Sequence, residues 1–64
     1  MNHYEEYKGH NFNVDTLDRG KGWTWEYQID GGVIHKGSDR PLRSEKLALQ
    51  EGIGNAKFAI DGMK

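Results

Sequence analysis

Large apolar and polar side chains alternate strictly over residues 23–29, Trp-Thr-Trp-Glu-Tyr-Gln-Ile, and the run ends at Asp30-Gly31-Gly32. Successive side chains of a β-strand point to opposite faces. One side of this segment therefore carries only Trp23, Trp25, Tyr27 and Ile29, and we call it the aromatic face. Strict alternation that meets turn residues is typical of a strand entering a β-hairpin.

Two shorter segments flank this strand. Phe12 and Val14 alternate with polar residues and predict a strand over 9–17, which the glycine-containing loop 18–22 joins to the tryptophan-rich strand as a hairpin. Residues 33–36, Val-Ile-His-Lys, predict a third and shorter strand. The expected sheet is therefore antiparallel.

The register of the third strand depends on the length of the turn that precedes it. A two-residue turn at Asp30-Gly31 places Ile34 on the aromatic face. One further loop residue places Val33 and His35 on that face instead. The sequence leaves both registers open.

The apolar period becomes helical after Pro41 and the polar connector around it. Ser44 is a good N-cap, and Glu45 in the first turn interacts favourably with the helix dipole. Apolar residues then recur at steps of four, three, four and three, as in one stripe of an amphipathic helix. The stripe consists of Leu49, Ile53, Ala56, Ile60 and Met63.

Small residues border this stripe. Ala48, Gly52 and Ala59 lie along one flank, where they allow the helix backbone to approach the sheet. Gly52 and Gly54 each cost roughly 1 kcal/mol relative to Ala inside a helix. Gly54 lies elsewhere on the helix, so close packing on the sheet does not explain it.

These elements predict an α+β fold of the order β-β-β-α, a three-stranded antiparallel sheet with one C-terminal helix packed on one face. The 64 residues form one domain, 1–64, in which residues 1–8 are a flexible or edge-pairing arm. The predicted structural core consists of Phe12, Val14, Trp25, Tyr27, Ile29, Leu49, Ile53, Ala56 and Ile60.

Composition narrows the class of protein. The chain has no cysteine, which excludes disulfides, a thiolate zinc site and a cysteine nucleophile. No apolar run approaches the roughly 20 residues that cross a bilayer, and residues 1–6 do not have the pattern of a signal peptide. A cytoplasmic protein is the expectation.

The aromatic face has two readings. Aromatic side chains can stack on the bases of single-stranded nucleic acid, or they can form the core beneath the helix. The apolar stripe of the helix favours the core, because no other segment could cover it. Trp23, next to the loop, is expected to be partly exposed and could line a rim pocket for a small ligand.

Two apolar residues fall outside the helical stripe. Leu47 and Phe58 lie about 160–180° from Leu49 around the helix. They predict a partner contact on the outer side of the helix, since exposed apolar groups mark interaction sites. The alternatives are a helix bent at its glycines, or the N-terminal arm folded over both residues.

A local excess of positive charge surrounds the start of the helix. Nine basic and ten acidic residues leave a net charge of −1, which gives no general attraction to nucleic acid. This stretch nevertheless contains four basic residues and only two acidic ones, Asp39 and Glu45. The possible anion or nucleic-acid contact consists of Lys36, Arg40, Arg43 and Lys46.

No pattern of catalytic residues is present. Ser38 and Ser44 are not in a G-x-S-x-G motif. The spacing of His3, His10 and His35 matches no compact pair of zinc ligands. We therefore expect no enzyme activity, no metal and no cofactor.

The pattern G-W-T-W-E-Y-Q-I-D-G-G at 22–32, followed by S-E-K-L-A-L-Q-E-G-I-G-N-A-K-F-A-I-D at 44–61, resembles small uncharacterised bacterial proteins of β-β-β-α order. In topology it is also similar to HicB-type antitoxins and to the truncated double-stranded-RNA-binding fold. The resemblance implies a helix packed across a three-stranded sheet, and topology alone assigns no function.

The expectation for function is a non-catalytic protein-interaction or self-associating module, such as a homodimer or a binder of another protein. It rests on the small size of the chain, on Leu47 and Phe58, and on the exposed edges of the sheet. The alternative is a nucleic-acid-binding module that uses the basic connector and helix start. No membrane partner is expected.

Overall fold

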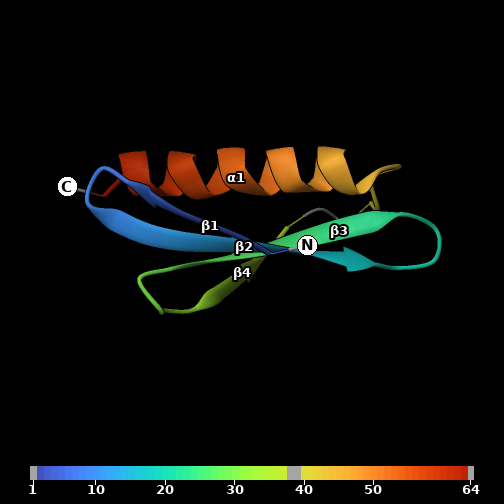
Figure 1. Cartoon of the computed structure of the whole chain (residues 1–64), viewed down its shortest axis with the longest axis horizontal. Coiled ribbons are helices and arrows are strands. Elements are labelled where there is room, and N and C mark those ends of the chain that lie inside the picture. Colours follow the sequence, from blue (N-terminus) through green and yellow to red (C-terminus); the bar gives the residue numbers. More distant parts are fainter. Residues whose placement is uncertain (1, 38–39, 64) are drawn as a thin grey trace.

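The computed structural model describes residues 2–37 and 40–63, which form a four-stranded antiparallel sheet with one helix across one face (Figure 1). The predicted α+β class and the C-terminal helix are confirmed. The sheet has one strand more than predicted. Its elements are β1 (Asn2–Tyr7), β2 (His10–Asp18), β3 (Trp23–Ile29), β4 (Ile34–Lys36) and α1 (Glu45–Asp61).

The additional strand is β1, whose residues we expected to belong to a flexible or edge-pairing arm, 1–8. It pairs with β2 along its whole length, from Asn2 opposite Asp15 to Tyr7 opposite His10. Lys8 and Gly9 connect the two strands with φ angles of 51° and 83°. Two consecutive positive φ values are those of a type I′ turn, the commonest two-residue hairpin connection. Gly9 is therefore a turn residue and not, as we expected, the first residue of the strand.

Strands β2 and β3 carry the core side of the sheet. Phe12 lies opposite Ile29, and Thr16 lies opposite Trp25. Since side chains alternate along each strand, these positions share one face, and α1 covers it. The predicted bounds of β3 and the choice of its aromatic face as the inner one are correct.

The turn between β3 and β4 contains the further residue of our second alternative. Asp30 and Gly31 have φ angles of 51° and 71°, and the Gly32 N–H donates to the Ile29 carbonyl at 2.9 Å. In the resulting register Tyr27 pairs with His35. The two rings stack at 5.0 Å between centroids on the helix side of the sheet.

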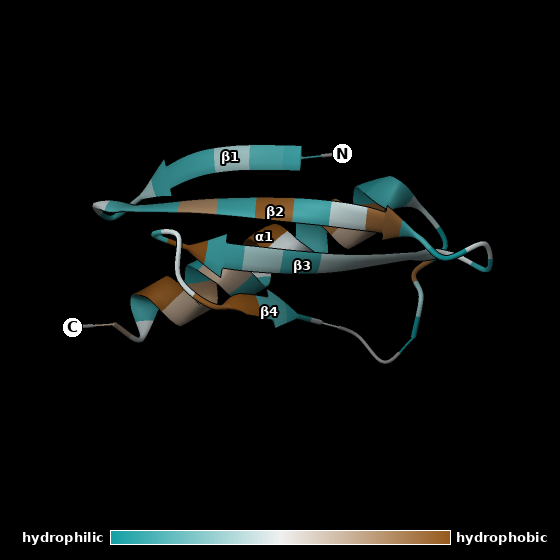
Figure 2. Cartoon of the chain, turned by 90° about the horizontal axis from the view of Figure 1, so that it is seen from below, coloured by the Kyte–Doolittle hydropathy of each residue, from teal (hydrophilic) through white to brown (hydrophobic). Residues whose placement is uncertain are grey.

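Ile34 lies on the opposite face of the sheet, which no helix covers (Figure 2). Its partner in the register is Gln28, a residue of the polar side of β3. We call this side the open face. Its residues are mainly polar, in keeping with an antiparallel sheet that has one face in water.

The core lies between the helix side of the sheet and α1. Six of the nine predicted core residues are buried, and Tyr27, Leu49 and Ile53 are partly buried against them. The buried apolar residues are Phe12, Val14, Trp25, Ile29, Ala48, Ala56 and Ile60.

Small side chains of α1 make the closest contact with the sheet. Ala48, Gly52, Ala56 and Ile60 are its buried residues and recur at steps of four. A Cβ atom added at Gly52 would lie 2.5 Å from Val14 Cγ1, so only glycine fits there without displacing Val14. The buried line is thus shifted toward the small flank of the predicted stripe. Met63, the last predicted member, follows the helix and is exposed.

The start of α1 agrees with the prediction. Ser44 has extended φ and ψ angles of −143° and 153°, and its Oγ accepts a hydrogen bond from the Leu47 N–H at 3.1 Å. This is the geometry of an N-cap. The preceding connector returns to β3, where Trp23 and Leu42 exchange backbone hydrogen bonds of 2.7 and 2.6 Å.

Candidate functional site

The outer side of α1 carries an exposed aromatic residue. Phe58 is 80% exposed and Leu47 is 39% exposed. At about 100° per residue, Leu47, Gly54 and Phe58 fall within about 40° of one another on the side away from Ala56. We call these three residues the outer helix face. The two apolar side chains are separated by about 16 Å along the axis.

Gly54 has no packing role within the chain. A Cβ added there would meet no atom within 4 Å, in contrast to the crowded Gly52. The residue therefore weakens the helix without improving its contact with the sheet. Because Gly54 has no side chain, another molecule could approach the helix backbone between Leu47 and Phe58.

The outer helix face is not covered by the N-terminal segment. That alternative is wrong, because β1 pairs with β2 in the sheet beneath α1 (Figure 1). The exposure of Phe58 is therefore a property of the folded chain. An isolated exposed Leu would need no explanation, but an almost fully exposed Phe on a helix does.

The four predicted basic residues do not form one surface. Lys36 lies opposite Glu26 on the open face, whereas Lys46 belongs to the first turn of α1 on the other side of the sheet. Arg40 and Arg43 are exposed in the connector. Ser38 and Asp39 of the same connector lie outside the described residues. Lys36 and Lys46 therefore lie on opposite sides of the sheet.

The aromatic face is closed to nucleic-acid bases. Trp25 is 5% exposed, and its Nε1–H donates to Glu51 Oε1 at 3.2 Å. Its ring stacks with Tyr27 at 6.0 Å between centroids. Trp23 is half-buried and packs against the core. Trp25 thus contributes to the packing of the sheet against the helix.

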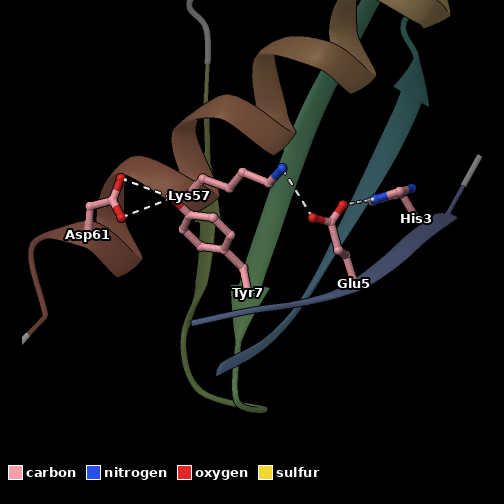
Figure 3. A network of polar contacts seen from close by, with 5 residues as sticks. All are labelled: His3, Glu5, Tyr7, Lys57 and Asp61. Carbon is pink, nitrogen blue, oxygen red and sulfur yellow. Dashed lines mark hydrogen bonds and ion pairs between the residues drawn. The ribbon is translucent and has the colours of Figure 1, made fainter. Parts of the chain in front are cut away.

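A network of polar side chains joins β1 to the C-terminal half of α1 (Figure 3). Lys57 Nζ lies 3.1 Å from Glu5 Oε2, and the Tyr7 hydroxyl donates to Asp61 Oδ1 at 3.0 Å. Lys8 Nζ donates to the same Asp61 oxygen at 2.7 Å. We call Glu5, Tyr7, Lys8, Lys57 and Asp61 the β1 clasp. It ties the edge strand to the helix across 54 positions of sequence.

The charges of the β1 clasp are matched. Hydrogen bonds from His3 and then Lys57 lower the pKa of the Glu5 carboxyl group. The hydrogen bond from Lys8, followed by that from Tyr7, lowers the pKa of Asp61. The β1 clasp is therefore suited to holding the strand in place.

Sequence reasoning missed the β1 clasp. Its partners come from opposite ends of the chain, and neither Tyr7 nor Asp61 belongs to a recognisable motif. The one available signal was the alternation of His3, Glu5 and Tyr7, which share the helix side of β1. Two of these three residues are polar, so the alternation carried no hydrophobic signal.

His3 and His10 each bind a carboxylate, and His35 stacks on Tyr27. His10 Nδ1 lies 2.6 Å from Asp30 Oδ2, and His3 Nε2 lies 2.8 Å from Glu5 Oε1. Hydrogen bonds from His10 and from the Asn11 N–H lower the pKa of Asp30. Within residues 2–37 and 40–63, no three His, Asp or Glu side chains are grouped so as to hold a metal ion.

A small hollow lies on the open face. Its volume is about 30 Å³, far below the roughly 300 Å³ of a small ligand site. It is therefore no site for a substrate-sized molecule. The residues around it are Asn13, Asp15, Glu26, Tyr27, Gln28 and Ile34.

Comparisons of the chain with protein-family models, with curated proteins and with solved structures give no match. The resemblance to HicB-type antitoxins and to double-stranded-RNA-binding folds stays a prediction. No helix in the described part of the chain has the length and apolar character needed to cross a membrane.

Proposed function

We propose that the chain is a non-catalytic protein-interaction module of the cytoplasm that binds its partner through the outer helix face. The observation that supports this proposal is the 80% exposure of Phe58 on a regular helix. Burying such a side chain contributes about 1.5–3 kcal/mol. That is enough for one aromatic anchor to dominate a small interface.

The shape of the face indicates the kind of partner surface. An exposed helix that presents apolar side chains along one line commonly binds in an apolar groove. Leu47 and Phe58 are the two anchors, and Gly54 between them admits a ridge of the partner. A second copy of this chain and a different protein are both partners of this kind.

The test compares two charge substitutions on α1. Phe58→Asp removes the anchor, and Gln50→Asp places the same charge on another exposed position of the helix. The natural chain and both variants are used to capture cross-linked proteins from the cells that produce the chain. A partner held by the natural chain and by Gln50→Asp, but lost with Phe58→Asp, supports the proposal.

An unchanged set of captured proteins with Phe58→Asp would reject this binding face. If the proposal is supported, light scattering over a concentration series tests whether the partner is a second copy of the chain. If the mass of the natural chain rises with concentration and that of Phe58→Asp does not, the partner on the outer helix face is a second copy.

A further inference from the structure

The free edge of β1 presents unpaired backbone groups. β1 is the outermost strand on its side of the sheet, and Figure 2 shows no other described segment of the chain along its outer edge. At six residues it is twice as long as β4, the other edge strand. It contains no proline and no lysine, the residues that most often protect an edge from pairing.

The type I′ turn determines which backbone groups point outward. Tyr7 and His10 close a two-residue hairpin, so they form a hydrogen-bonded pair. Hydrogen-bonded and non-hydrogen-bonded pairs alternate along an antiparallel ladder. His3 and Glu5 therefore direct their backbone groups toward β2. The groups that point away from the sheet belong to Asn2, Tyr4 and Glu6.

We propose that this edge pairs with the same edge of a second copy, in antiparallel register around a two-fold axis at Tyr4. Tyr4 then lies opposite Tyr4 of the second copy, and Asn2 lies opposite Glu6. Asn2, Tyr4 and Glu6, whose backbone groups point away from β2, each lie opposite one of the same three residues of the second copy. Each such pair exchanges two backbone hydrogen bonds. The register uses every unpaired group of the edge.

The side chains fit the same register. On the helix side, His3 of one copy lies opposite Glu5 of the other, and within one chain these side chains already bind each other at 2.8 Å. Shifting the register by two residues in one direction places Glu5 opposite Glu5, which is unfavourable. A shift in the other direction leaves Glu6 unpaired.

The open face adds an aromatic contact. Tyr4 is 70% exposed and lies at the centre of the edge strand. On the two-fold axis its side chain meets its own symmetry mate on the same face of the joined sheet, and cross-strand aromatic pairs stabilise antiparallel sheets. The negative charge of Glu5 is balanced by Lys57 at 3.1 Å and does not block the approach.

This inference is independent of the proposed function. The two-fold axis is perpendicular to the joined sheet, so both copies of α1 lie on the same side of it. The outer helix faces remain exposed, since they point away from the sheet. The dimer would thus present two copies of the proposed binding face in one direction.

Amide hydrogen exchange tests the pairing one residue at a time. In a single chain the N–H groups of Tyr4 and Glu6 face solvent, while those of His3, Glu5 and Tyr7 bond to β2. We expect exchange at Tyr4 and Glu6 to slow at least tenfold as protein concentration rises, with the other three unchanged. Concentration-independent exchange at both residues would overturn the proposal. The chain carries no added residues at its N-terminus in this experiment.

Proline substitution provides the matched variants. Tyr4→Pro removes an outward N–H, which a free edge tolerates. We expect its mass by light scattering to stay that of one chain at concentrations where the natural chain approaches twice that mass. Circular dichroism checks that the variant is folded, and Glu6→Pro replaces it if it is not. Tyr4→Phe keeps the backbone and should still dimerise.

The outcomes separate the two interfaces. A dimer that survives Tyr4→Pro but is lost in Phe58→Asp places self-association on the outer helix face and overturns the inference. A dimer lost in Tyr4→Pro and kept in Phe58→Asp supports the β1 edge, and it leaves the proposed partner binding to its own test. A natural chain that is monomeric at all concentrations also overturns the inference.

Discussion

At the scale of single residues, the two glycines inside α1 have opposite surroundings. Gly52 faces Val14 and Trp25 with no room for a methyl group, whereas Gly54 faces open space. We expect Gly52→Ala to lower the free energy of unfolding by about 1–3 kcal/mol, because the overpacking outweighs the gain in helix propensity. Urea denaturation followed by circular dichroism measures the change.

Gly54→Ala is the matched control. It should raise the free energy of unfolding by up to about 1 kcal/mol, since the added methyl group meets nothing and alanine favours the helix. Equal effects of the two substitutions would show that α1 does not lie against the sheet through Gly52.

Trp25 is the residue on which the core depends most. Its ring packs against α1 on one side, and the Gly37 backbone lies so close that an added Cβ would come within 1.8 Å of Trp25 Cη2. We expect Trp25→Ala to unfold the chain, because such truncations cost about 3–5 kcal/mol and a small domain has little reserve. Circular dichroism and thermal denaturation give the readout. A stable, cooperative variant would instead assign the aromatic face to a binding surface.

At the scale of elements, the β1 clasp couples the edge strand to α1 through carboxylates. Folding lowers the pKa values of Glu5 and Asp61, so their contribution to stability is present at neutral pH and is lost as the pH falls through the lowered values. We expect the combined variant Glu5→Gln, Asp61→Asn to lose less stability than the natural chain between about pH 6 and pH 3. Urea denaturation at both pH values measures this difference.

Glu6→Gln is the control for this experiment, because Glu6 lies on the open face of the same strand and outside the β1 clasp. Its response to acid should remain that of the natural chain. If the combined variant responds to acid like Glu6→Gln, the β1 clasp does not stabilise the folded chain in solution.

At the scale of the whole molecule, one shared core joins sheet and helix. Residues of β2, β3 and α1 all contribute to it, and α1 contacts both central strands. We therefore expect a single cooperative unfolding transition, with the loss of helix coinciding with the exposure of Trp25. Circular dichroism and tryptophan fluorescence report the two events. Separate midpoints would mean that α1 unfolds on its own.

The free edge of β1 is also a property of the whole molecule. It becomes visible only when the chain is folded, since Tyr4 is unremarkable in the sequence until its strand partners are known, whereas helical spacing alone already places Phe58 outside the apolar stripe. Exposed apolar side chains and unpaired strand edges are both features through which proteins associate.

The sequence by itself determined the elements whose signals are local. Alternation over residues 23–29 predicted β3 with its correct bounds, and Ser44 predicted the start of α1, because strand faces and helix caps depend on residues within a few positions. The same local patterns predicted most of the core and placed Phe58 outside the apolar stripe of the helix.

Only the tertiary structure decided what depends on distant residues. β1 carries polar side chains on both faces, so its pairing with β2 left no hydrophobic pattern. The register of β4 depends on one additional loop residue. Tyr7 binds Asp61 only because the fold brings the two ends of the chain together. Such contacts are determined by the closure of the whole chain, and no short window of sequence contains both partners.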